Sequence, residues 1–345
     1  MRIAVYATSH RLKRCIMTSI PEKMRGGAMN DWKGMKVVLL GAGSAVPDPV
    51  RGNPSQAVVI DGEVLVIDCG ERATVNLVRA GINPLDVGYL FITHMHWDHI
   101  VDYNYLLFST WNCGKSTPIK VFGPTGTKRM SDGMLEMHHI DVEFVKRYIE
   151  QLPDHITNRP QPVPPIDVEE IHEGVIVETD KFKVTSREIV HLQPLGFERS
   201  SYAYRIDSDY GSAVFSGDTE PCDAMVEISK DVDVLVHECT FLEDILDYRQ
   251  NVEGQKGAEK IAWTGHTGPR GAGWIAHRAN AKKLVLTHLG PYDSPPAAIE
   301  MASMYYGERR GPEIWSQIIG EAKETFAGPV IIGEDAMVIP VNEPA

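Results

Sequence analysis

The segment that decides the fold runs from Tyr89 to His99 and reads Tyr-Leu-Phe-Ile-Thr-His-Met-His-Trp-Asp-His. Its first four residues form an apolar, β-type run, and the polar residues after them are typical of a loop at the end of a strand. Three imidazoles and one carboxylate lie within six positions of this loop, at His94, His96, Asp98 and His99. Single histidines are often hydrogen-bonded in a core, and an aspartate before a helix is often an N-cap. Four such groups this close would repel one another or be poorly solvated without a cation, so the segment predicts a metal site.

The spacing of these residues favours two cations over one. His94 and His96 alternate along the loop and can point to the same side of it. We expect Asp98 and His99 to begin the next element, a helix, so that they approach a second point from another direction. Mixed imidazole and carboxylate ligands suit zinc first, with manganese or iron as alternatives.

The His-x-His-x-Asp-His pattern resembles the motif of the metallo-β-lactamase superfamily. Within that superfamily the chain is most similar to the ribonuclease Z and arylsulfatase-like branch, because five further blocks occur in the order of that branch. The blocks are Leu40–Ser44, Asp68–Glu71, Ser216–Thr219, His237–Thr240 and Leu286–His288. The resemblance implies an α/β fold, the αββα four-layer sandwich, in which two packed sheets lie between outer layers of helices.

The resemblance also implies a ligand set for two metals. The first metal would be bound by His94, His96 and His191, and the second by Asp98, His99 and His288, with Asp218 shared between them. A carboxylate between two cations offsets their mutual repulsion. Asp68 is implied to orient a metal-binding histidine, with a plain turn aspartate as the alternative.

A hydrolytic mechanism follows from the same resemblance. Two adjacent cations would lower the pKa of a bridging water and hold the attacking hydroxide beside a bound ester oxygen. Asp98 would hold the proton of that hydroxide. His266 resembles the histidine that helps to protonate the leaving oxygen, and Glu238 would orient and charge it. A plain helix start near His266 is the alternative.

The bulk properties of the 345 residues are those of a globular protein with a large core, either one large domain or two small ones. A formal net charge of −13 and the absence of a basic run oppose extended contact with nucleic acid. Five widely spaced cysteines without a Cys-x-x-Cys pair favour reduced thiols and a cytoplasmic location. No apolar run approaches a membrane-spanning length, so no membrane partner is expected.

Residues 1–34 are predicted to be a flexible N-terminal extension, with packing on a neighbouring subunit as the alternative, because basic residues dominate them up to Arg25. Residues 35–345 form the predicted catalytic domain. The apolar runs predict strands over Met35–Leu40, Gln56–Asp61, Glu63–Asp68, Tyr89–Ile92, Ile119–Gly123, Lys181–Val190, Ser201–Asp207, Ser212–Ser216, Val232–Val236 and Lys283–Thr287. Helices are predicted over Glu71–Ala80 and from about Thr125. The proline-rich residues 151–167 predict a surface loop, and whether it covers the cleft is left open.

Hydrolysis of a small ester, either a phosphodiester or an aryl sulfate, is the leading function. Ribonuclease Z carries a long arm for tRNA between the strands that correspond to residues 201–207 and 212–216, whereas only the short turn Asp209–Gly211 is available here. The missing arm and the negative charge make tRNA 3′ processing a less favoured function. Trp97 replaces the small residue usual at that motif position in the ribonuclease branch, so it is a candidate to narrow the cleft or to stack on an aryl or alkyl group.

Two alternatives come from different classes. The same centre would also suit a lactone, a carboxylic ester or a thioester, because each offers a carbonyl to the same nucleophile. A non-catalytic binding protein would be expected to have lost a ligand, and every ligand position of the motif set is filled. The expected partner is a small-molecule ester, and a homodimer is left open.

Overall fold

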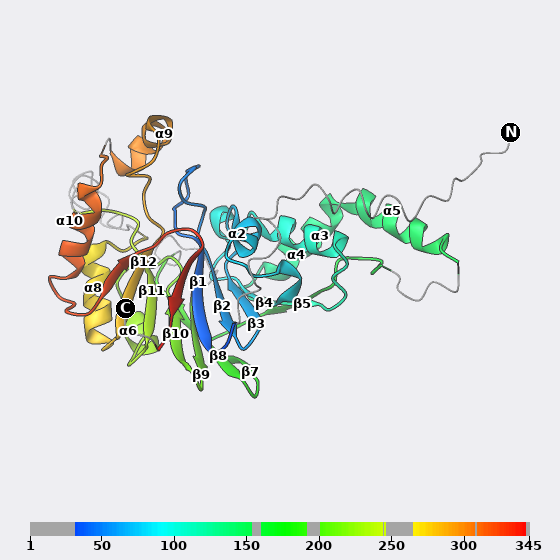
Figure 1. Cartoon of the computed structure of the whole chain (residues 1–345), viewed down its shortest axis with the longest axis horizontal. Coiled ribbons are helices and arrows are strands. Elements are labelled where there is room, and N and C mark those ends of the chain that lie inside the picture. The colour runs from blue at the N-terminus through cyan, green and yellow to red at the C-terminus, as the bar shows by residue number, and fades with distance from the viewer. Residues whose placement is uncertain are drawn as a thin grey trace, which may run out of the picture. The chain divides into compact units, whose positions relative to one another are not determined.

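The computed structural model describes residues 32–153, 160–191, 201–243, 245, 265–307 and 309–342, which form two mixed β-sheets packed face to face with helices on both outer faces (Figure 1). This arrangement confirms the predicted αββα sandwich. Residues 1–31, and with them most of the predicted extension, lie outside the described residues. Among the described residues, no helix is both long and apolar enough to cross a membrane.

The first sheet contains seven strands. In spatial order these are β14 (Met337–Pro340), β1 (Met35–Gly41), β2 (Ser55–Ile60), β3 (Glu63–Ile67), β4 (Val87–Phe91), β5 (Ile119–Gly123) and β6 (Ile166–Glu170). The predicted hairpin is formed by β2 and β3 around Asp61 and Gly62, which both have positive φ angles, of 46° and 83°. Such φ angles match the right-handed twist of the two strands, so this turn fixes their register.

The second sheet also contains seven strands. Their order is β13 (Val330–Ile332), β12 (Lys283–Thr287), β11 (Val234–Glu238), β10 (Gly211–Phe215), β9 (Ser201–Ser208), β8 (Phe182–Ile189) and β7 (Gly174–Glu178). Strands β10, β11 and β12 are parallel to one another. Their carboxyl ends therefore meet at one edge of the sheet.

Both faces of the central strands are apolar, which explains the four layers. In β1, Val37 and Leu39 belong to the core between the sheets, whereas Val38 and Leu40 face the core beneath the first helical layer. Successive side chains of a strand point to opposite faces. A strand with apolar residues at both parities needs cover on both sides, and the helices supply it.

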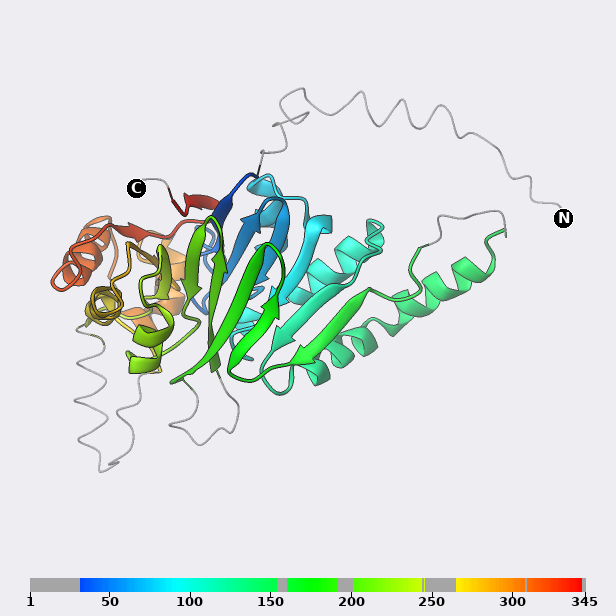
Figure 2. The same cartoon turned by 90° about the horizontal axis from the view of Figure 1, so that it is seen from below.

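The helices divide between the two outer faces. On the first sheet these are α2 (Ala73–Arg79) and α3 (Tyr103–Asn112), followed by α4 (Thr127–Met137) and α5 (His139–Glu150); the short turns are η2 (Pro84–Asp86) and η3 (Trp97–His99). The second sheet is covered by α6 (Asp223–Ile228), α8 (Pro269–Arg278) and α10 (Glu313–Ala322), with α9 (Pro296–Tyr306) nearby. Helix α5 has no buried residue and extends away from the strands (Figure 2).

Two predictions about local structure are wrong. The helix after the metal motif begins at Tyr103 rather than at Asp98, because residues 97–99 form only the single turn η3. The short strands β6, β7, β13 and β14 were not predicted, and β6 includes the last two residues of the predicted proline-rich loop. The described part of that loop lies beside α3 and β5, since Trp111 Nε1 donates to Gln161 O at 2.8 Å; residues 154–159 lie outside the described residues.

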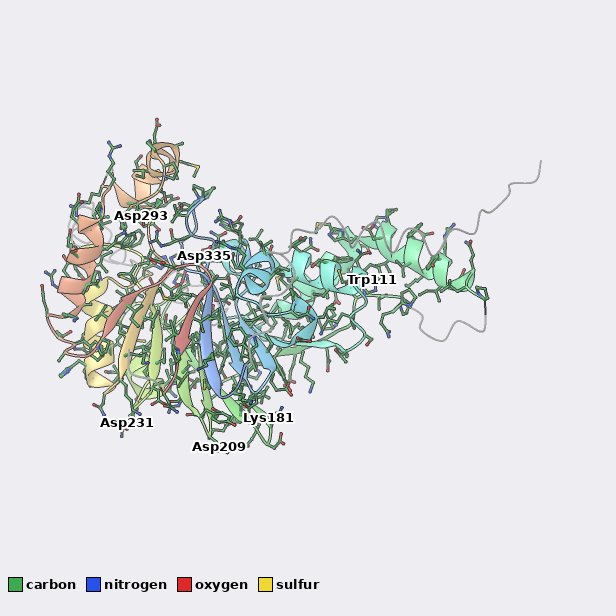
Figure 3. The ribbon with its side chains drawn as sticks, in the orientation of Figure 1. Trp111, Lys181, Asp209, Asp231, Asp293 and Asp335 are labelled. Carbon is green, nitrogen blue, oxygen red and sulfur yellow. The ribbon has the colours of Figure 1, made fainter. Side chains whose placement is uncertain are left out.

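The short turn between β9 and β10 is present, but it lies far from the metal motif. Tyr202 N, at the start of β9, donates to Thr93 O at 2.9 Å. At about 3.4 Å per residue, the far end of this strand, at Ser208, lies about 20 Å from Tyr202. Figure 3 accordingly shows Asp209 at the end of the sheets opposite to Asp335. The shortness of this turn therefore says nothing about access to the motif.

Candidate metal centre

The predicted site residues come together at one edge of the sandwich, where several strands end. The motif loop follows β4, and the three more distant donors His191, Asp218 and His288 follow β8, β10 and β12. Because these strands end at the same edge, ligands far apart in the sequence become neighbours. The donor atoms form two groups, in each of which they lie within 4.8 Å of one another.

The first group consists of three imidazoles and a carboxylate. His96 Nδ1 lies 3.0 Å from His94 Nε2 and 3.2 Å from His191 Nε2. At a zinc–nitrogen distance of about 2.0–2.1 Å, the nitrogens of a tetrahedral site lie about 3.3 Å apart. Asp218 Oδ2 lies 3.6 Å from His94 Nε2. The four donors therefore have the spacing of a single cation site.

The second group contains Asp98, His99 and His288, and it also contacts Asp218. His288 Nε2 lies 3.4 Å from both Asp98 Oδ2 and Asp218 Oδ2, and His99 Nε2 lies 3.2 Å from Asp218 Oδ1. His99 Nε2, His288 Nε2 and Asp218 Oδ1 are buried and make no hydrogen bond with the described residues. Buried atoms that face one another as ion pairs without hydrogen bonds are costly, and a cation bound between them would offset this cost. Asp218 contacts both groups, so the residues fit a dinuclear metal site.

The remaining ring nitrogens of the ligands are held by hydrogen bonds. His99 Nδ1 donates to Asp68 Oδ2 at 2.7 Å, and His94 Nδ1 donates to Thr93 Oγ1 at 3.0 Å. Thr93 in turn donates its hydroxyl to Asp68 at 2.8 Å. One carboxylate thus fixes the orientation of two histidines and leaves their Nε2 atoms for a metal. This is the place the sequence predicted for Asp68; Thr93 was missed, although it directly precedes His94.

The Nδ1 atoms of two further histidines, His191 and His288, are also held by hydrogen bonds. His191 Nδ1 donates to Gly265 O at 2.6 Å, and His288 Nδ1 donates to Thr240 Oγ1 at 2.9 Å. Thr240 then donates to Glu238 Oε2 at 2.6 Å. Thr240 was not predicted, and its position two residues after Glu238, on the same side of the extended chain, was the available signal.

The buried Glu238 and the partly exposed His266 form a pair beside Asp218. His266 Nδ1 lies 3.1 Å from Glu238 Oε1 and 3.8 Å from Asp218 Oδ2. Thr219 N also donates to Glu238 Oε1, at 2.7 Å. Burial would raise the pKa of Glu238, but the neighbouring His266 outweighs burial and lowers it. The carboxylate is therefore an anion, and it lies within hydrogen-bond distance of both Thr219 N and His266 Nδ1.

Without cations, the imidazoles of the two donor groups differ in their pKa values. Burial lowers the pKa of His191 to about 4 and that of His94 well below its usual value, so these rings are neutral. For His99 and His288 burial acts in the same direction, but the nearby carboxylates, led by Asp218, outweigh it and raise both pKa values. Neutral imidazoles are the form that binds a metal, and a cation takes the place of the protons on the other two rings.

The backbone around the site is strained or closely packed. Asp68 and His288 have φ angles of 56° and 57°, in the left-handed region that non-glycine residues seldom adopt. A Cβ at Gly70 would lie 2.4 Å from Asp98 O, and one at Gly217 would lie 2.8 Å from Thr93 Cβ. Glycine is required at these two positions because neighbouring segments approach so closely.

Trp97 is the predicted residue that stays outside the donor groups. It lies on η3 between His96 and Asp98, and 55% of its surface is exposed. The structure therefore places its indole at the surface beside the centre.

Comparison with known proteins places the chain in a family. The model for the family described as Anti-Pycsar protein Apyc1 matches residues 35–247. A ribonuclease Z from Mycobacterium sp. (strain KMS) is 30% identical over 263 residues, which cover 76% of this chain and 86% of that protein. The short form of human tRNase Z matches 89% of this chain and 100% of its own with a TM-score of 0.61 and 20% identity. The metallo-β-lactamase fold protein YhfI from Bacillus subtilis matches 89% of this chain and 99% of its own with a TM-score of 0.59, also at 20% identity.

These relatives agree with the geometry described above. The solved structures share the sandwich fold, and the sequence relative is named a ribonuclease. With the two donor groups at the strand ends, they show that the chain is a metal-dependent hydrolase. The chain belongs to the Anti-Pycsar protein Apyc1 family, within the ribonuclease Z-like part of the metallo-β-lactamase superfamily.

Proposed function

We propose that residues 35–345 form a dinuclear zinc phosphodiesterase that acts on a small phosphodiester. The observation that carries this proposal is the position of Asp218 between the two donor groups, with the His266–Glu238 pair on a third side of the same carboxylate. Zinc is the preferred metal because nitrogen donors outnumber oxygen donors, and manganese or iron are the alternatives. Two cations held by these donors would lower the pKa of a water molecule and neutralise charge on the phosphoryl oxygens.

The protein's own residues supply the proton transfers. In the proposed mechanism Asp98 accepts a proton from the attacking water; its Oδ2 lies 3.4 Å from His288 Nε2. His266, when protonated on both nitrogens, can give its Nε2 proton to the leaving oxygen. Glu238 acts as a positioning residue, because it holds His266 by Nδ1.

The donor groups also limit which esters suit the site. A phosphodiester is an anion. The two donor groups that it would approach consist of two aspartates and five histidines. Binding a cation pair there offsets the carboxylates and leaves a net positive centre for an anionic ester. A lactone, a carboxylic ester and a thioester are neutral and would gain less from that charge. An aryl sulfate remains possible on charge alone, but the sequence relative described above is named a ribonuclease rather than a sulfatase.

Processing of RNA is the second candidate, and the name of that relative is the observation that favours it. The absence of a long arm between β9 and β10 is a weaker argument against RNA than the sequence suggested, since that turn lies at the far end of the sheets. The net charge of −13 still opposes docking of a folded RNA outside the cleft.

A substrate panel on zinc-loaded and manganese-loaded protein tests the proposal. The panel contains an aryl phosphodiester, an aryl sulfate, a lactone, a thioester and a precursor tRNA, each assayed at moderate salt beside the His266→Ala variant. We expect the phosphodiester to be hydrolysed fastest. Faster cleavage of the sulfate or of a carbonyl ester would overturn the proposal, and site-specific trimming of the RNA 3′ end with the small esters inert would establish the second candidate.

A further inference from the structure

A pocket of about 420 Å³ lies next to the metal-binding loop. It is lined by Trp97 and Val101, by four residues of the loop after β1, and by three polar residues: Val46, Pro47, Asp48 and Pro49, and Asn53, Glu71 and Arg72. The volume falls within the range of about 300–1,000 Å³ that is usual for small-molecule sites. A Cβ at Gly70 would lie 2.4 Å from Asp98 O and 2.7 Å from Asn53 Cβ, so the pocket, which Asn53 lines, adjoins the loop that carries the donors.

The wall formed by Trp97 and Val101 is apolar and open to the outside. The two side chains are 55% and 48% exposed. Trp97 is more than half exposed, whereas Asp98 and His99 in the same turn are buried, so the indole reaches the surface while its neighbours face the interior. An indole in this position offers a flat, apolar face to any group that lies beside the reacting ester.

The side of the pocket formed by the loop after β1 is held in place before anything binds. Arg72 donates to the backbone carbonyls of Asp48 and Pro49, and the Asp48 carboxylate accepts from Val50 N at 2.8 Å and from the Ser294 hydroxyl. The prolines restrict the backbone between these contacts. A wall that is already ordered loses little conformational entropy on binding, so it can contribute to affinity.

We propose that this pocket binds a planar aromatic group on the part of the phosphodiester that is retained after cleavage, with the group stacked on Trp97. The inference rests on the proposed phosphodiesterase function. It specifies the substrate class, because such a pocket makes the enzyme selective for aryl over alkyl phosphodiesters. Trp97 is then a specificity residue, and the proton transfers stay with Asp98 and His266.

Two substrates with the same leaving group isolate this effect. Phenyl 4-nitrophenyl phosphate and methyl 4-nitrophenyl phosphate both release 4-nitrophenolate and differ only in the retained group. We expect the wild type to prefer the phenyl ester, and Trp97→Ala to lower the ratio of the two kcat/KM values by about tenfold, mainly through KM. Trp97→Phe should restore most of the ratio. Tyr105→Ala, which removes an aromatic side chain of similar exposure outside the pocket, should leave the ratio unchanged.

Binding of inert ligands separates failure of the pocket from failure of the function. Benzylphosphonate and ethylphosphonate carry a CH₂ group in place of the ester oxygen and are not hydrolysed, so their dissociation constants can be measured by calorimetry on metal-loaded protein. Tighter binding of benzylphosphonate that depends on Trp97 supports the pocket even if no phosphodiester is cleaved. An enzyme that hydrolyses phosphodiesters but shows the same aryl-to-alkyl ratio in the wild type and in Trp97→Ala would overturn the inference and leave the proposed function intact.

Discussion

The two halves of the metal centre are built in different ways. One half comes from a single loop after β4, which contributes His94, His96, Asp98 and His99 within six residues. The other half comes from His191, Asp218 and His288, each at the end of a different strand of the second sheet. The loop half can be recognised in the sequence as a metal motif, whereas the strand-end half exists only because parallel strands end together. The comparison shows that the motif predicts a cation site, whereas the second sheet supplies Asp218, the residue that joins the two donor groups.

The largest effect is expected from the residue that joins the two halves. Asp218→Ala should lose both metals and lower turnover by at least about 10⁴-fold, because no other described carboxylate contacts both groups. Elemental analysis and initial rates on an aryl phosphodiester measure the two outcomes. Asp223→Ala, an exposed carboxylate paired with Arg278, is the control and should keep both. Retention of two metals in Asp218→Ala would show that the six remaining donors bind both metals without a shared carboxylate.

A smaller effect, confined to turnover, is expected for the pair beside the strand-end half. His266→Ala should retain metal and lose about 10²–10⁴-fold in kcat, as is usual when a general acid is removed. His277→Ala, on the exposed face of α8, serves as the histidine control. If His266→Ala lost as much metal as Asp218→Ala, His266 would be a ligand rather than an acid.

The support of the loop half can be tested through Asp68. Asp68→Asn is suited to this test because asparagine tolerates the left-handed backbone found there, so the main change is loss of the carboxylate. We expect metal affinity to fall by about 10- to 100-fold, since His99 and His94 lose their shared anchor. Competition with a chelator measures the affinity. An unchanged affinity would reduce Asp68 to a turn residue, which was the alternative the sequence left open.

The smallest effect is expected on the strand-end side, at Thr240. Thr240→Val removes the hydroxyl between His288 and Glu238 while keeping the shape of the side chain, and it should weaken metal binding by about 3- to 10-fold. Thr240→Ser retains the hydroxyl and should behave like the wild type. A loss as large as that of Asp68→Asn would show that the two halves are supported equally strongly.

Strong local patterns predicted most of the fold. Each of the apolar runs Met35–Leu40, Ile119–Gly123 and Lys283–Thr287 corresponds to a strand of the structure, and Asp61-Gly62 corresponds to a turn. The missed strands β13 and β14 are three and four residues long, too short for a periodic pattern to stand out. The start of α3 was predicted too early. Asp98 was expected to begin a helix, but it lies in the turn η3 and belongs to a donor group.

The sequence by itself determined the chemistry of the site: a cluster of imidazoles and carboxylates that cannot lie together without cations, carried on strands whose two apolar faces require a layered fold. The tertiary structure alone decided which atoms meet. In the structure Asp68 orients the rings of His94 and His99, and Thr240 lies between His288 and Glu238. The β9–β10 turn lies at the far end of β9 from the motif loop. The reason is that ligand identity is a property of single residues, whereas hydrogen-bond partners and the shape of a pocket depend on segments that only the packing of two sheets brings together.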